Sequence, residues 1–191
     1  EALATRRVVL LEAPPGAGKS TAVPLALLDA AWREGGRILM LEPRRIAARA
    51  VAERMATLIG EQAGQTIGFR TRLETRVGPR TQVEVVTEGI LTRMLQHDPA
   101  LEGTACVVFD EFHERNLQGD LGIALSLECQ RHLRESLRLL IMSATLDGEA
   151  LLRLLGDAAV VRSPGRMFDV VTSTVPRSNR PSIATARLYR R

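Results

Sequence analysis

The chain has 191 residues, 45% hydrophobic and 25% charged, which is enough for one globular domain with a real core and excludes two large domains. Its formal net charge of +4 comes from 26 basic and 22 acidic residues, and it favours a polyanionic partner without establishing one. Aromatic residues make up only 3%, which excludes base stacking as the main mode of nucleic-acid binding and leaves the phosphates as the group to be bound.

Other classes of protein are disfavoured by what the sequence lacks. Cys106 lies in an apolar run and Cys129 in a helical pattern, and without a C-x-x-C spacing both are interpreted as core residues. No run of 18 apolar residues and no signal-type N-terminus is present, so we expect a cytoplasmic protein without a membrane partner. Because the chain begins at Glu1 rather than at methionine, we expect it to be part of a longer protein.

Apolar runs and helical patterns alternate along the chain. In chain order the patterns predict strand 8–11, helix 21–33, strand 38–41, helix 45–59, strand 83–86, helix 89–96, strand 105–109, helix 120–132, strand 137–142, helix 147–155 and strand 158–161. Such alternation is typical of a three-layer α/β/α domain with a mostly parallel sheet, whose ligands bind at the carboxyl ends of the strands.

This domain is predicted to cover residues 1–162. Residues 163–191 are interpreted as a turn, a further strand over 168–175 and a basic linker, and a short helix could follow over 182–189. The alternative for this tail is disorder.

A glycine-rich stretch, APPGAGKST at residues 13–21, follows the first predicted strand. A turn of this kind between a buried strand and a helix surrounds one point with backbone N–H groups, where a polyphosphate can bind. Lys19, the only lysine of the chain, would reach the β- and γ-phosphates, and the Ser20 hydroxyl would hold Mg²⁺. The predicted nucleotide-binding residues are Gly16, Ala17, Gly18, Lys19, Ser20 and Thr21.

The first position of the motif G-x-x-x-x-G-K-S/T is Ala13 rather than glycine, which fits a tight turn provided that its φ is negative. The alternative is a loop that simply joins a strand to a helix. The apolar strand before the loop and the helical pattern after it favour a nucleotide loop.

Two acids, Asp110 and Glu111, directly follow the apolar strand 105–109. At the end of a buried strand beside a nucleotide loop, such acids can hold Mg²⁺, and Glu111 can in addition align and deprotonate the attacking water. The alternative is an acidic turn that caps a helix. Ser143-Ala144-Thr145 follows strand 137–142 and supplies two hydroxyls at the same edge, which favours the catalytic interpretation.

With these motifs in this order, the chain resembles the DEAH-type helicases of superfamily two, and most of all their bacterial HrpB branch. The resemblance covers nearly the whole chain and is carried by PPGAGKS at 14–20, EPRRIAA at 42–48, GFRTRLE at 68–74, TEGIL at 87–91, DEFHER at 110–115 and PGR at 164–166. The sequence departs from the family at Ala13, at Phe112 in place of alanine, and at Leu73, where an aromatic residue is usual.

The resemblance implies that the chain is the first of two RecA-like domains of a P-loop NTPase that uses ATP, or other NTPs, with Mg²⁺. The second RecA-like domain of the same parent chain would supply an arginine finger. The implied partner is single-stranded nucleic acid, RNA rather than DNA. Its phosphates would contact Arg44, Arg45, Arg72 and Thr87.

For Arg44 and Arg45 the local pattern agrees with this role, since a Pro-Arg-Arg turn at a strand end directs two guanidinium groups toward the ligand-binding edge. The resemblance further implies that Arg54 stacks on the nucleotide base and that His113 links the nucleotide site to Ser143 and Thr145. For Arg54 the alternative is a solvated arginine on the exposed side of a helix.

We therefore expect the N-terminal motor domain of a helicase, which couples hydrolysis to translocation along a strand. A P-loop small-molecule kinase is the first alternative, but it would need an arginine-rich lid and an acceptor pocket, and nothing after Thr145 resembles either. A scaffold that binds nucleotide without hydrolysing it is the second alternative, and the presence of Glu111 argues against it.

Overall fold

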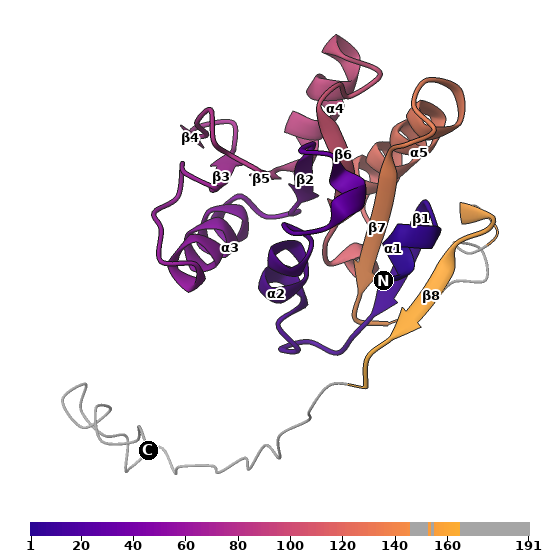
Figure 1. The fold of residues 1–191 in the computed structure, drawn as a ribbon, viewed down its shortest axis with the longest axis horizontal. Helices are drawn as coiled ribbons and strands as arrows, with labels where there is room; N and C mark the ends of the chain where they lie inside the picture. The colour runs from indigo at the N-terminus through magenta and orange to yellow at the C-terminus, as the bar shows by residue number, and fades with distance from the viewer. Residues whose placement is uncertain (146–152, 154, 165–191) are drawn as a thin grey trace, which may run out of the picture.

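The computed structural model of the chain describes residues 1–145, 153 and 155–164. The strands are β1 (Val8–Glu12), β2 (Arg37–Leu41), β3 (Ile67–Arg70), β4 (Thr75–Arg76), β5 (Val83–Val86), β6 (Thr104–Phe109), β7 (Arg138–Ser143) and β8 (Ala159–Arg162). They form one sheet in the order β4-β3-β5-β2-β6-β7-β1-β8 (Figure 1). All neighbouring strands run parallel except β3 and β4, which confirms the mostly parallel sheet that the sequence predicts.

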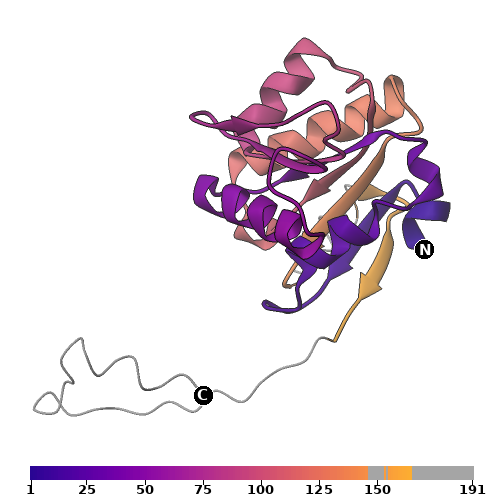
Figure 2. The same ribbon diagram turned by 60° about the vertical axis from the view of Figure 1, so that its left-hand side comes forward.

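Helices cover both faces of this sheet (Figures 1 and 2). They are α1 (Ala2–Thr5), α2 (Lys19–Ala26), α3 (Arg45–Leu58), α4 (Glu88–His97) and α5 (Leu117–His132), with short 3₁₀ turns η1 (Ala31–Arg33) and η2 (Phe112–Glu114). Along β6, Cys106 and Val108 pack in the cluster that contains α3, whereas Val107 and Phe109 pack in the cluster that contains α4 and α5. Alternate side chains of the buried strands thus build two cores, one on each side of the sheet.

The six predicted strands are confirmed to within one residue at each end. Strands β3 and β4 are not among the predicted strands. In β3 the apolar run is short and is interrupted by Gly68, where a Cβ would lie 2.6 Å from the Arg76 carbonyl oxygen. The close approach of two backbones therefore requires a residue that weakens the strand pattern.

Two helix predictions need correction. The predicted helix 21–33 ends at Ala26, because the chain tightens into i→i−3 hydrogen bonds and turns at Ala30, whose ψ of 117° is extended. The helix predicted from residue 120 begins at Leu117, because the Asn116 side chain accepts a hydrogen bond from the Gly119 N–H and caps the helix.

Of the predicted helix 147–155, the structure describes Arg153 and Leu155, both helical. The strand predicted over 168–175 and the helix predicted over 182–189 lie outside the described residues.

Strands β3, β5, β2, β6, β7 and β1 are consecutive and parallel, so their carboxyl ends share one edge of the sheet, called the carboxyl edge below. Every predicted site residue except Arg54 belongs to a segment that leaves one of these six ends. The nucleic-acid residues follow β3, β5 and β2, and the nucleotide residues follow β6, β7 and β1. The topology therefore divides the carboxyl edge into two adjoining halves.

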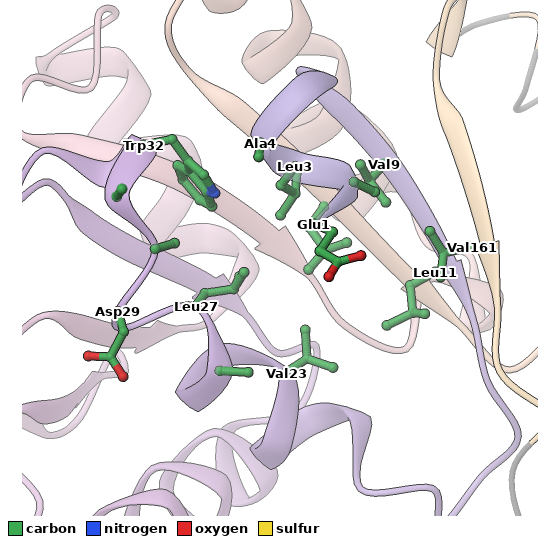
Figure 3. A pocket seen from close by; sticks show the side chains of 15 residues that line it. Glu1, Leu3, Ala4, Val9, Leu11, Val23, Leu27, Asp29, Trp32 and Val161 are labelled. Atoms are coloured by element: carbon green, nitrogen blue, oxygen red, sulfur yellow. The ribbon is translucent and has the colours of Figure 1, made fainter.

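An apolar cavity of about 650 Å³ lies elsewhere, on the sheet face next to α1 and α2 (Figure 3). Its lining includes Leu3, Val23, Leu27 and Trp32, and it contains none of the predicted site residues. In the part of the chain that the structure describes, no helix is both long and apolar enough to cross a bilayer.

Candidate active site

The glycine-rich loop joins β1 to α2 and is tied to the neighbouring strand, since the Ala13 N–H donates to the Ser143 carbonyl at 3.0 Å. Gly16 and Gly18 have φ of 79° and 76°, a left-handed conformation that glycine adopts without steric cost. Ala13 is not among the residues with positive φ, so alanine is tolerated at the first motif position. Gly18 precedes the first turn of α2, whose free N–H groups point back toward the loop.

Lys19 crosses from the end of β1 toward the end of β6. Its side chain is almost fully buried, and its Nζ lies 3.1 Å from Glu111 Oε1. Since β7 lies between these two strands, the loop, the Ser143 segment and the acidic pair face one another. Lys19 and Glu111, which lie 92 positions apart in the sequence, are therefore in direct contact.

Asp110 is 4% exposed and has one oxygen that the protein satisfies and one that it does not. Oδ1 accepts the Glu111 N–H at 2.9 Å, whereas the buried Oδ2 has no hydrogen-bond partner among the described residues. Burial raises the pKa of Asp110, and the nearby Ser20 hydroxyl and the Glu111 N–H oppose that rise. An unpaired buried carboxylate oxygen next to a hydroxyl is the kind of ligand that Mg²⁺ takes, with the nucleotide phosphates and water completing its shell.

Glu111 has a φ of 49°, a left-handed conformation that costs a non-glycine residue about 1–2 kcal/mol. This conformation ends β6 sharply and starts η2. The carboxylate lies between Lys19 and the His113 Nε2, which is 3.3 Å from Oε2. His113 Nδ1 accepts the Ala144 N–H at 3.2 Å, so in the neutral tautomer that this contact selects the proton is on Nε2, the ring nitrogen that faces Glu111.

The resemblance implies that His113 links the nucleotide site to Ser143 and Thr145. In the structure its contact with this triplet is to the main chain of Ala144. The Ser143 hydroxyl instead donates to the Thr145 carbonyl at 2.5 Å, within the triplet itself.

Phe112, where the family has alanine, is buried in the core, and the Arg115 guanidinium lies 5.2 Å from its ring centroid. The larger side chain therefore occupies core space and leaves the contacts of Glu111 and His113 in place.

Glu42 is a further acid at this edge, and the sequence did not single it out as a site residue. It directly follows β2 and is 4% exposed. Burial, followed by the negative charges of Asp110, Glu111 and Glu114, raises the pKa of Glu42 to about 8. The signal that singled out Asp110, an acid directly after an apolar strand, also applies to Glu42.

The predicted nucleic-acid residues lie on the other half of the edge. The side chains of Arg45 and Arg72 are exposed, and neither side chain forms a hydrogen bond or ion pair with a residue that the structure describes. Thr87 precedes α4, and its hydroxyl does not cap that helix. Arg44 differs, since its guanidinium forms an ion pair with Glu114 at 2.5 Å.

Two other features of this half concern α3. Glu74, in the turn between β3 and β4, pairs with Arg49 of α3 at 3.1 Å and with Arg76 at 3.0 Å, so the turn that carries Arg72 is attached to α3. Arg54 is exposed on α3 and has no hydrogen-bond or ion-pair partner among the described residues. Its contact with a nucleotide base stays a prediction.

Comparison with known proteins identifies the family. The model of the DEAD/DEAH box helicase family matches residues 1–154. The chain belongs to this family. Its fold is accordingly the RecA-like fold of the P-loop NTPases, as the sequence predicts.

Relatives of this DEAD/DEAH helicase domain include the ATP-dependent RNA helicase HrpB of Escherichia coli K12, 56% identical over 88% of the chain and 21% of that protein. The human ATP-dependent RNA helicase DHX30 is 38% identical over 85% of the chain and 14% of that protein. The chain thus spans about a fifth or less of the length of these relatives.

Two solved structures of HrpB from Escherichia coli match the domain closely. A crystal structure of this protein as a DExH-box NTPase has a TM-score of 0.83 at 56% identity and covers 88% of the chain and 21% of the solved chain. A second, described as a DEAH/RHA helicase, has a TM-score of 0.84 at 51% identity and covers 98% of the chain and 25% of the solved chain.

Proposed function

We propose that the chain is the nucleotide- and nucleic-acid-binding domain of an ATP-dependent DEAH-box RNA helicase. It would bind an NTP with Mg²⁺, contact a single strand and couple hydrolysis to translocation together with a second RecA-like domain. The observation that carries the proposal is the convergence of Lys19, Asp110 and Glu111 at one point of the carboxyl edge. A buried lysine opposite two acids is costly unless a charged ligand is to be bound there.

Each residue of the nucleotide half has a distinct task in this proposal. The loop N–H groups and Lys19 bind the phosphates, and Ser20 and Asp110 hold the metal, with Glu111 next to it. When bound, Mg²⁺ offsets the charge that develops on the transferred phosphoryl group. Glu111 orients the attacking water and accepts its proton. Its ion pair with Lys19 must first break, so that Lys19 can bind the phosphates instead.

His113, Ser143 and Thr145 support this arrangement. The His113 ring faces Glu111 through Nε2 and accepts from the main chain of Ala144 through Nδ1, so a shift in the Ser143 segment would be transmitted to the proposed general base. Arg54 would stack on the nucleotide base, a role supported only by its exposed, unpaired side chain on α3.

The nucleic-acid half is proposed to bind phosphates rather than bases. Arg45 and Arg72 are exposed cations without a protein partner in the described residues, and Thr87 offers a hydroxyl beside them. RNA is proposed over DNA because the relatives at 56% and 38% identity are named RNA helicases.

A second RecA-like domain is part of the proposal because the chain spans so small a share of its relatives. An arginine finger from such a domain is typically worth about 10³- to 10⁵-fold in rate. We therefore expect the 191-residue chain alone to bind nucleotide but to hydrolyse it slowly.

Hydrolysis of γ-labelled ATP, followed by thin-layer separation of the products, tests the proposal. We expect free phosphate, formed slowly by this chain and faster when the longer protein that contains it is given single-stranded RNA. Lys19→Ala is the control and should form none. Transfer of the label to a small acceptor, or RNA-independent turnover at the full rate by the chain alone, would contradict the proposal.

A further inference from the structure

The two halves of the carboxyl edge meet where β2 lies beside β6. At this boundary Arg44, which follows β2, pairs with Glu114, which ends η2 after β6. The two side chains are 71% and 32% exposed, so the pair is open to ligands and to solvent. It joins a residue of the nucleic-acid half to the acidic turn of the nucleotide half.

The partners of this pair have different neighbours. Arg44 stands next to Arg45, which has no partner among the described residues and so is free to take a phosphate at once. Glu114 belongs to the same turn as His113, which contacts both Glu111 and the main chain of Ala144. A change at Arg44 therefore has a short physical path to the general base.

We propose that the ion pair between Arg44 and Glu114 is a switch that reports occupation of the nucleic-acid half to the nucleotide half. A phosphate of the bound strand takes Arg44 from Glu114, and the freed Glu114 lets the η2 turn change its contacts with the nucleotide site. The inference rests on the proposed function and adds to it the device by which the two ligands influence each other.

The energetics suit a switch. An exposed ion pair such as Arg44–Glu114 lowers the affinity of the arginine for a competing phosphate by only about 1.5- to 5-fold. A phosphate can therefore displace Glu114. Once freed, Glu114 leaves an uncompensated negative charge close to Glu42, which also lies close to Asp110 and Glu111 of the nucleotide half. Because such coupling is reciprocal, bound nucleotide must also change the affinity for the strand.

Fluorescence anisotropy with a labelled single-stranded RNA tests the first step. Glu114→Gln should bind the RNA about 1.5- to 5-fold more tightly than the unaltered chain, because Arg44 has lost its competitor. The gain should shrink as salt is raised, since salt screens the competing pair. Arg44→Ala should weaken binding, and adding Glu114→Gln to Arg44→Ala should bring no further gain.

Glu135→Gln is the matched control. It also removes one negative charge and one arginine partner, since Glu135 pairs with Arg7 at 3.4 Å, but it lies at the opposite edge of the sheet. Its RNA affinity should stay near that of the unaltered chain. An equal gain in Glu135→Gln, or a gain of Glu114→Gln that persists with Arg44→Ala, would overturn the switch, because both results indicate a general effect of charge.

Titration of a fluorescent nucleotide with Mg²⁺, with and without saturating RNA, tests the second step. RNA should change the nucleotide affinity of the unaltered chain and leave that of Glu114→Gln nearly unchanged. The same ratio in both proteins overturns the switch while leaving the proposed function intact. Failure of the unaltered chain to bind RNA at all would instead overturn the proposed nucleic-acid function, and the switch with it.

Discussion

Lys19 and Glu111 form an ion pair in the structure, but we propose different tasks for the two residues. In the proposed function Lys19 would bind the charge that the nucleotide already has in the ground state, whereas Glu111 would act on the attacking water. Lys19→Ala should therefore abolish nucleotide binding. Glu111→Gln should keep binding within a fewfold and lower hydrolysis by about 10²- to 10⁴-fold, the usual contribution of a general base.

Nucleotide titration and single-turnover hydrolysis of both variants, made in the longer protein, measure this division of roles. Equal loss of binding in the two variants would mean that Glu111 serves the ground state as well.

Glu42 makes stability depend on pH. Its pKa rises from 4.5 to about 8 on folding, so between these values the folded protein binds more protons than the unfolded chain, and stability falls as pH rises through this window. Asp110, whose pKa is also raised, acts in the same direction. Glu42→Gln should reduce the fall, because an amide does not ionise.

Urea unfolding of Glu42→Gln and the unaltered chain between pH 4.5 and 8 measures the effect. One unit of pKa shift corresponds to about 1.4 kcal/mol, so the variant should gain a few kcal/mol relative to the unaltered chain by pH 8 and nothing near pH 4.5. If the stability of Glu42→Gln and of the unaltered chain changed in parallel with pH, Glu42 would be ionised in the folded protein over this whole pH range.

At the scale of elements, the turn between β3 and β4 depends on Gly68. A Cβ there would lie 2.6 Å from the Arg76 carbonyl oxygen and 3.0 Å from the Thr81 side chain, with backbone that cannot easily move. Gly68→Ala should therefore cost about 1–3 kcal/mol of stability. It should also weaken RNA binding, because the displaced turn carries Arg72.

Gly89→Ala is the matched control, since nothing lies within 4 Å of a Cβ at Gly89 in α4 and alanine favours helix. Thermal unfolding and RNA anisotropy of both variants make the comparison. Equal stability of the two would show that β3 and β4 separate without cost.

The elements also show what sequence can predict here. The buried parallel strands are continuous apolar runs, so their positions and the chemistry at their ends could be predicted, including the loop at Lys19 and the acid at Asp110. Strand β3 could not be predicted, because close backbone packing requires glycine in its middle and this glycine interrupts the apolar run. The early end of α2 depends on local hydrogen bonding near Ala30, which no periodicity indicates.

Ion pairs between segments far apart in the chain cannot be predicted from the sequence pattern either, but for a different reason. Arg44 and Glu114 are 70 positions apart, and only the placement of β2 beside β6 brings them together. The sequence could predict that each lies at the carboxyl edge, but not that one neutralises the other.

For the whole molecule, we expect one edge of one sheet to bind two ligands side by side. Residues after β6, β7 and β1 would bind the nucleotide, and residues after β3, β5 and β2 would bind the strand. The six strands are buried and parallel, so they hold both halves in a fixed relation. A change at their boundary can then couple the ligands without rearranging the sheet.

Amide hydrogen exchange of the chain tests this division of the edge, when it is measured with Mg²⁺ and a non-hydrolysable ATP analogue and separately with single-stranded RNA. The nucleotide should protect residues 13–21 and 110–113, and RNA should protect residues 44–49 and 71–76. Protection of the same segments by both ligands, or RNA protection confined to residues outside 44–49, 71–76 and 87, would contradict the division of the edge.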